Sequence, residues 1–377
     1  MKKAKLTILI LVCLIFSGIK SPEAQVVFGQ RSSATLGAIY QSWDLKKKTE
    51  TITLTQWAVP FELFVPLREN LELRIYSSGT SVGLKEKKID TYLREINDTK
   101  VEVAGSFLDD RYLLSLGANI PSGKSSLKGI EIEIASYLFL DYLNFPIKNL
   151  GEGLNLNLNL IRAFQCDKFI WGAGVGYQYS GTYQPYSDLS DYKPGDKAYL
   201  TGGFSLNTGK TKISGDVTYG IYQKDKQDKK EIFKDGNQLD LKGKLLYDYQ
   251  RLALKVFARV LLRAKDQRYG TAKIHLEEAK NHGNDFRFST SLSYRVTSKV
   301  SLSGQVEAKY VQANDYHPSH TLHRGRSYFT GFGGGISFKI KRYFYQGLSF
   351  KMFQGEADGG ILDLSGYQIQ SSILINF

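Results

Sequence analysis

Apolar and polar residues alternate along most of the chain from residue 31 onward. In 153–165, four leucines at every second position alternate with asparagines. In 251–265, every second residue from Leu252 to Leu262 is apolar, and a basic residue recurs at every fourth residue of the chain, on the opposite face. Successive side chains of a β-strand point to opposite faces, so this period of two predicts strands that are apolar on one side.

Sixteen segments carry this strand pattern. Most exceed the usual strand length of about 5 to 6 residues and match the ~9 to 11 residues that a tilted strand needs to cross a bilayer. The segments are 31–43, 49–65, 71–82, 99–108, 111–120, 153–165, 168–180, 198–208, 211–224, 238–249, 251–265, 285–296, 299–313, 327–341, 343–353 and 364–377.

The connections between these segments alternate in length. Short turns are expected at 68–70, 109–110, 166–167, 209–210, 250, 297–298 and 342. Longer polar loops are expected at 83–98, 121–152, 181–197, 225–237, 266–284 and 314–326. This predicts an all-β fold, an antiparallel transmembrane β-barrel of about 14–16 strands with short periplasmic turns and long extracellular loops. A soluble periplasmic β-protein, whose strands also alternate, is the rival interpretation.

The N-terminus has the pattern of an export signal. Three lysines within residues 1–5 precede an apolar run at 6–19, and 21–24 form a small-residue boundary. The run is shorter than the ~20 residues of a membrane-spanning helix. We therefore expect a cleaved signal peptide at 1–24 and a single barrel domain at 25–377. The two cysteines in the chain exclude a disulfide framework.

The last strand carries a second indication of an outer-membrane barrel. Tyr367, Ile373, Ile375 and the terminal Phe377 share one face of the strand, and the chain stops on the aromatic residue. This resembles the C-terminal signature of outer-membrane barrels. The resemblance implies an outer-membrane location in a Gram-negative-type cell, with the barrel-assembly machinery and the membrane lipids as partners.

Basic residues dominate the face opposite the apolar one in the ninth to fifteenth strands. Without 1–24 the net charge is +10, from 46 basic and 36 acidic residues. If the apolar face meets lipid, the basic face lines the lumen and favours anions. We expect a passive channel or transporter for small-molecule solutes. The predicted selectivity residues are Arg251, Lys255, Arg259, Arg263, Lys242, Lys244 and Arg295.

The connection after Ile120 is the longest. Ile130, Ile134 and Leu138 follow helical spacing within 128–142, which predicts a short amphipathic helix. The alternation of isoleucine and glutamate in 130–134 favours a further strand instead. A loop of this length either folds inward and constricts the lumen or caps the rim from outside, and the pattern leaves both open.

Other candidate chemistry is sparse. His317, His320 and His323 are weak candidates for metal binding, because Pro318 breaks helical geometry and no carboxylate or thiolate completes a site. The neighbouring arginines favour the phosphates of lipopolysaccharide as partners. Enzyme signatures are missing, so we expect no enzymatic activity, no cofactor and no nucleic-acid partner.

Two loop motifs add a family resemblance. Residues 108–112 followed by Asn-Ile-Pro-Ser-Gly-Lys at 119–124, and Tyr-Lys-Pro-Gly-Asp at 192–196, resemble segments of the outer-membrane transporters of long-chain fatty acids and aromatic compounds. The resemblance implies uptake of hydrophobic or aromatic solutes, and a basic lumen suits an anionic amphiphile. A structural or adhesive barrel with a plugged lumen is the alternative function.

Overall fold

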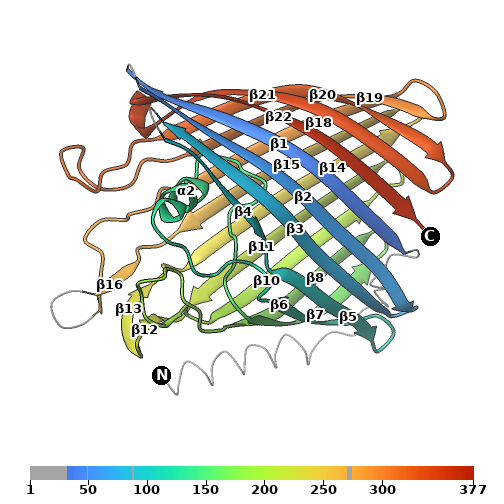
Figure 1. Cartoon of the computed structure of the whole chain (residues 1–377). Coiled ribbons are helices and arrows are strands. Elements are labelled where there is room, and N and C mark those ends of the chain that lie inside the picture. Colours follow the sequence, from blue (N-terminus) through green and yellow to red (C-terminus); the bar gives the residue numbers. More distant parts are fainter. Residues whose placement is uncertain (1–31, 49, 87–88, 270–273) are drawn as a thin grey trace.

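The computed structural model describes residues 32–48, 50–86, 89–269 and 274–377, and the expected signal peptide at 1–24 lies outside them. Within these ranges the chain forms a closed antiparallel barrel (Figure 1). Its strands are β1 (Ser33–Lys47), β2 (Glu50–Arg68), β3 (Leu71–Glu86), β4 (Ile89–Ile96), β5 (Thr99–Phe107), β6 (Tyr112–Ile120), β7 (Asn155–Cys166), β8 (Phe169–Ser180), β10 (Lys197–Asn207), β11 (Thr211–Tyr222), β14 (Gln238–Tyr249), β15 (Leu252–Arg263), β18 (Asp285–Arg295), β19 (Val300–Val311), β20 (Ser327–Lys341), β21 (Phe344–Ala357) and β22 (Leu362–Asn376).

The first and last strands close the barrel. β1 pairs with β2 on one side and with β22 on the other, with Ser33 opposite Asn376 at one end and Lys46 opposite Asp363 at the other. Closure gives the backbone groups of both strands partners within the sheet, as a bilayer requires. The two strand ends that meet at Ser33 lie on the side of the short turns.

All sixteen predicted strands are present, and one predicted loop is wrong. The stretch 83–98 is not a loop, because β3 continues to Glu86 and β4 pairs back onto it, with Ile89 opposite Glu86. After Asn97 and Asp98 the chain continues as β5 along the same neighbour, β3. The wall therefore has sixteen positions. The sequence of β4 contains charged residues on both faces, so it lacks the apolar alternation that predicts a strand.

Long apolar side chains cover the outer face of the barrel. Six that represent the band are between 38 and 49% exposed: Leu156, Leu158, Val217, Leu241, Leu302 and Val306. Their sequence neighbours on each strand point inward. The predicted apolar outer face is confirmed. The inner face is mixed: it carries polar and charged side chains such as Gln56 and Lys309, and also buried apolar ones such as Trp43 and Leu54. No described helix is long and apolar enough to cross a membrane.

Three of the long loops form a second, smaller sheet at the end of the barrel opposite Ser33 and the C-terminus (Figure 1). It consists of β9 (Tyr192–Lys193), β12 (Asp225–Gln227), β13 (Lys230–Lys234), β16 (Gln267–Tyr269) and β17 (Ile274–Leu276). These short pairings order loops that the sequence marks only as polar. A 3-10 turn, η1 (Asp358–Gly360), lies between β21 and β22.

Glycine–aspartate bonds close the open ends of three hairpins beside this sheet. In each, a glycine N–H before one strand donates to an aspartate Oδ1 after its partner strand. The pairs are Gly195–Asp225, Gly236–Asp266 and Gly325–Asp358, at 2.7, 2.8 and 2.7 Å. A Cβ at Gly236 would lie 2.3 Å from the carbonyl oxygen of Ala264, so only glycine fits this approach.

The long connection between β6 and β7 lies inside the barrel and carries the predicted helix, α2 (Ile130–Leu138) (Figure 1). We call residues 121–154 the inward segment. Its apolar side chains pack with inward side chains of the wall in one cluster, which includes Trp43, Leu45, Leu54, Val82, Leu84, Leu93, Ile134, Leu138, Leu143, Phe145, Leu150, Phe329 and Phe353. The hydrophobic core of this protein is therefore within the barrel, on the side of β1 to β4 and β20 to β22.

Candidate functional site

The inward segment crosses the lumen and is fastened to the wall along its length. The side-chain amide of Gln56 donates to the Ile147 carbonyl at 2.7 Å and accepts from the Ile147 N–H at 3.0 Å. Gln41 donates to the Asn144 carbonyl at 3.0 Å. Since Gln41 and Gln56 point into the barrel, these bonds place the segment in the lumen and not over the rim.

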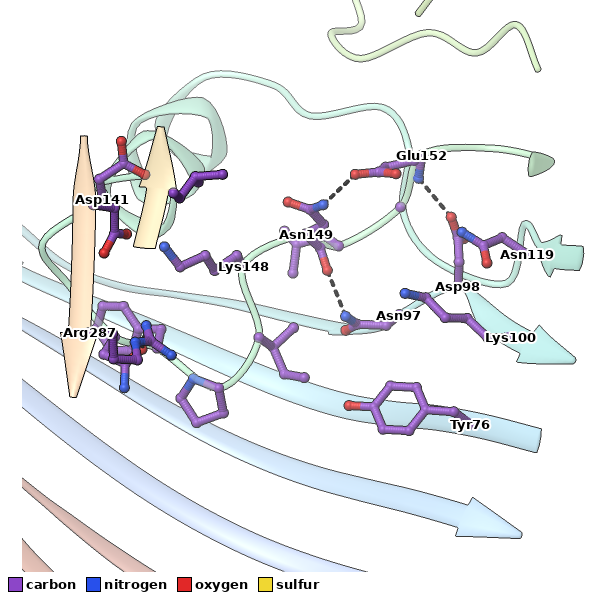
Figure 2. A pocket seen from close by; sticks show the side chains of 18 of the residues that line it. Tyr76, Asn97, Asp98, Lys100, Asn119, Asp141, Lys148, Asn149, Glu152 and Arg287 are labelled. Carbon is purple, nitrogen blue, oxygen red and sulfur yellow. Dashed lines mark hydrogen bonds between the residues drawn. The ribbon is translucent and has the colours of Figure 1, made fainter. Parts of the chain in front are cut away.

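A second anchor is the junction between β4 and β5. Asp98 accepts the N–H of Gly123 at 2.9 Å through Oδ1 and the N–H of Glu152 at 2.7 Å through Oδ2. Asn97 donates to the Asn149 carbonyl at 2.6 Å (Figure 2). One carboxylate therefore holds both ends of the inward segment.

A cavity of about 490 Å³ lies between the inward segment and the walls formed by β3, β5 and β6 and by β15, β18 and β19 (Figure 2). Six cationic and four anionic side chains line it. They are Lys100, Lys148, Arg259, Arg263, Arg287 and Lys309, with Asp98, Asp141, Glu152 and Asp285. The charge of the lining is thus positive by two.

Four basic residues form a continuous row across the barrel wall, and three of them line this cavity. Lys242 of β14 lies opposite Arg259 of β15, Arg259 opposite Arg287 of β18, and Arg287 opposite Lys309 of β19. Directly paired residues of neighbouring strands have adjacent side chains on the same face. We call these four residues the basic row. Like charges placed side by side destabilise a sheet, so the row needs anionic or polar partners.

Acidic and amide side chains partly neutralise the basic row and its neighbour Arg263. Asp240 binds Arg259 at 2.8 Å and Lys242 at 3.1 Å. Asp285 binds Lys309 at 3.2 Å. Three further bonds reach the inward segment: Arg263 pairs with Asp141 at 3.2 Å, Arg287 donates to the Asn144 side chain at 2.5 Å, and Lys309 donates to the Asp141 carbonyl.

Lys148 of the inward segment faces the same space. It extends toward the side of the cavity where Asp141 and Arg287 lie (Figure 2). Its ammonium group makes no hydrogen bond or ion pair within the described part of the chain. Burial lowers the pKa of this ammonium, while the charge of Asp141 raises it. Lys148 lies in a loop and not in an alternating strand, so the alternation does not indicate that it faces the lumen.

The seven predicted selectivity residues do not all lie at the constriction. Arg259 and Arg263 line the cavity beside the inward segment, and Lys242 belongs to the basic row. Lys244 and Lys255 line a separate cavity of about 280 Å³, which lies nearer the short turns of the barrel. Arg251 and Arg295 are at the turn ends of β15 and β18, at the level of the periplasmic rim, where the N–H of Arg295 donates to the Arg251 carbonyl at 2.8 Å. Alternation assigns a face to a residue, but not a height in the barrel.

The predicted assembly signature lies on the outer face of β22. Tyr367, Ile375 and Phe377 are 38, 40 and 65% exposed, and Ile373 follows the same alternation. The Tyr367 ring lies 5.7 Å from that of Tyr40 on the neighbouring strand. These side chains lie on the exposed outer face of β22, and their part in barrel assembly stays a prediction.

Each of the three loop histidines contacts a residue of its own loop, and two of them share Tyr316. The Nδ1 atom of His317 lies 2.8 Å from the Ser319 hydroxyl, His320 stacks on Tyr316 at 4.6 Å, and the Nδ1 atom of His323 lies 2.8 Å from the Tyr316 carbonyl oxygen. Among the residues described, no three His, Cys, Asp or Glu side chains are arranged to hold a metal ion.

No protein-family model matches the sequence, and no curated protein matches it. Several solved structures are similar in fold. Pseudomonas aeruginosa OccK11 (OpdR) is 9% identical, with 95% of this chain and 99% of that chain covered and a TM-score of 0.45. Pseudomonas aeruginosa OpdL is 11% identical, with 92 and 99% covered and a TM-score of 0.44. The CymD monoaromatic hydrocarbon channel is 11% identical, with 93 and 89% covered and a TM-score of 0.43.

The protein is an outer-membrane β-barrel. The closed sheet of sixteen wall positions, the apolar outer face and the partly polar inner face are what a strand-built membrane protein requires. An inward segment divides its lumen at the level of the basic row.

Proposed function

We propose that the barrel is a passive channel for small solutes and that its constriction selects hydrophilic anions. The observation that carries this proposal is the basic row on the wall opposite the inward segment. Rings of basic side chains in a narrow pore favour anions. Lys148 adds a cation from the other side of the passage, without a carboxylate of its own.

The lining favours hydrophilic anions over amphiphiles. Phe145, Ile147 and Leu150 are 4, 5 and 5% exposed, so these apolar side chains are buried while the polar backbone of the segment borders the cavity. An alkyl or aromatic body would therefore meet peptide groups and charges instead of an apolar wall. An apolar body would bury these polar groups without hydrogen bonds, which costs free energy. A hydrophilic solute can instead replace the hydrogen bonds that these groups make with water.

Reversal potentials in planar bilayers test this function. Refolded protein is measured under a KCl gradient as wild type and as the double variant Lys148→Met with Arg287→Gln. Glutamine keeps a donor for Asn144 while removing the charge. We expect chloride to be preferred over potassium in the wild type, and the permeability ratio to fall roughly twofold or more in the variant, because two cations are removed from a narrow passage.

Arg295→Gln is the matched control, since it removes one cation at the periplasmic end of the lumen. It should leave the permeability ratio close to that of the wild type. A wild-type channel that prefers potassium, or a double variant with unchanged selectivity, would contradict the proposed role of the constriction.

A plugged structural or adhesive barrel is the second candidate function, and the packing of α2 against Trp43 and Leu54 favours it, because a segment held by a core blocks part of the lumen. A correctly folded barrel without conductance would support this candidate. In either case we propose two partners beyond the membrane lipids. The barrel-assembly machinery would bind the last strand, and lipopolysaccharide phosphates would meet Arg324 and Arg326 at the extracellular rim.

A further inference from the structure

The imidazole of His282 lies between two carboxylates from different parts of the fold. Its Nδ1 atom is 3.9 Å from Oδ2 of Asp141, in the inward segment. Its Nε2 atom is 3.8 Å from Oδ2 of Asp266, at the start of the extracellular loop that also carries His282. Both ring nitrogens thus stand within ion-pair distance of an acidic oxygen, but beyond hydrogen-bond distance of it. The Nε2 atom also lies 3.3 Å from Nδ2 of Asn281, which donates to Nε2 only while that nitrogen carries no proton.

Asp266 has an unused acceptor at this point. The residue is 6% exposed, and its Oδ1 atom accepts the N–H of Gly236 at 2.8 Å. Its Oδ2 atom is buried and has no hydrogen bond within the described residues. A buried acceptor without a donor is costly, so an N–H placed there is stabilising. A neutral imidazole has one N–H, and only the protonated ring can donate to Asp266 and Asp141 together.

The other charged groups around His282 come from two further elements and from its own loop. Arg263, at the end of β15, binds Asp141 at 3.2 Å. Arg324, in the loop after β19, also opposes protonation of the ring. Within the histidine's own loop, Glu277 accepts the N–H of Asp266 at 3.2 Å. Burial lowers the pKa of His282, against the effect of the two aspartates, so the ring is neutral near pH 7 and takes up a proton in acid.

We propose that His282 is a proton-operated latch between the extracellular loops and the inward segment. At neutral pH, the Asp141 carboxylate is held by Arg263, and the Asp141 carbonyl oxygen accepts from Lys309. In acid, the imidazolium bonds to Asp141 and Asp266 at once and fastens the inward segment to the loop sheet. The positions of His282, Asp141 and Asp266 support this latch. Its effect on the channel, a constriction that fluctuates less in acid, rests on the proposed function.

Hydrogen exchange tests the latch without relying on conductance. Refolded protein is exchanged at pH 7.5 and pH 5.0, rates are corrected for the intrinsic pH dependence of amide exchange, and peptides from 139–152 are compared. Because His282 is partly exposed, we expect a modest gain, with exchange about two- to fivefold slower at pH 5.0 in the wild type. His282→Gln should show no such gain.

Two variants serve as controls. His275→Gln changes an exposed histidine of the same loop, and Asp235→Asn removes another loop carboxyl that titrates in acid; both should keep the wild-type gain. Equal protection of 139–152 at both pH values in the wild type would overturn the latch, and so would an undiminished gain in His282→Gln. A barrel that does not conduct would refute the proposed channel, while the exchange result would still decide on His282.

Discussion

Truncating Leu138 should loosen the inward segment. This side chain of α2 is fully buried, at 0% exposure, in the cluster inside the barrel. Leucine-to-alanine changes at such sites cost about 2 to 5 kcal/mol. A loss of about 3 kcal/mol in the packing of the segment raises the population of its detached state roughly a hundredfold. The strands keep their own pairing, so the barrel itself should still close.

Two measurements follow the detached state. Single-channel records of Leu138→Ala should show larger or noisier currents than the wild type, because the segment no longer fills one side of the lumen. Limited trypsin digestion should also cut at Lys148, which the packed segment shields. Phe139→Ala is the matched control, since Phe139 is the next residue and is 59% exposed. If Leu138→Ala kept wild-type currents and wild-type trypsin resistance, the cluster would not be what holds the segment.

Three further predictions concern the rim, the loops and the last strand. Gly236→Ala should lower the temperature at which the folded band is lost in gels, because its Cβ would meet the Ala264 carbonyl oxygen at 2.3 Å, whereas Gly243→Ala, with no atom within 4 Å, should not. Burial raises the pKa of Asp235 from its ordinary 3.8 to about 6, so the folded chain binds this proton more tightly than the unfolded chain. The folded state is therefore destabilised as the pH rises from 3.8 to about 6, and ionised Asp235 keeps it so at higher pH. Asp235→Asn should accordingly raise that temperature at pH 7.5 and leave it unchanged near pH 4, and an effect of equal size at both pH values would exclude titration as the cause. Deleting Phe377 should reduce the amount of barrel recovered in outer-membrane fractions; unchanged recovery would separate this residue from assembly.

Local chemistry was enough to predict the barrel wall. Alternation along 153–165 and 251–265 depends only on the two faces of a strand and on the lipid outside, so the sequence determines which residues point inward. The turns and the helix of the long connection also follow from local signals. The alternation does not predict β4, because Asp90, Arg94 and Glu95 interrupt an apolar face within its eight residues.

Only the tertiary structure decided the constriction. Which residues meet across a sheet depends on the register of neighbouring strands, and alternation within one strand contains no information about that register. Arg259 and Arg287 therefore share a row, while Arg251 and Arg295, on the same inward faces, lie at the periplasmic end. Lys148 and His282 belong to loops without a repeating pattern, and their positions depend on long-range contacts such as the bond between Gln56 and Ile147. The sequence by itself determined the wall and its two faces, because these follow from residue spacing. The path of the inward segment and the partners of its charges required the closed barrel around it.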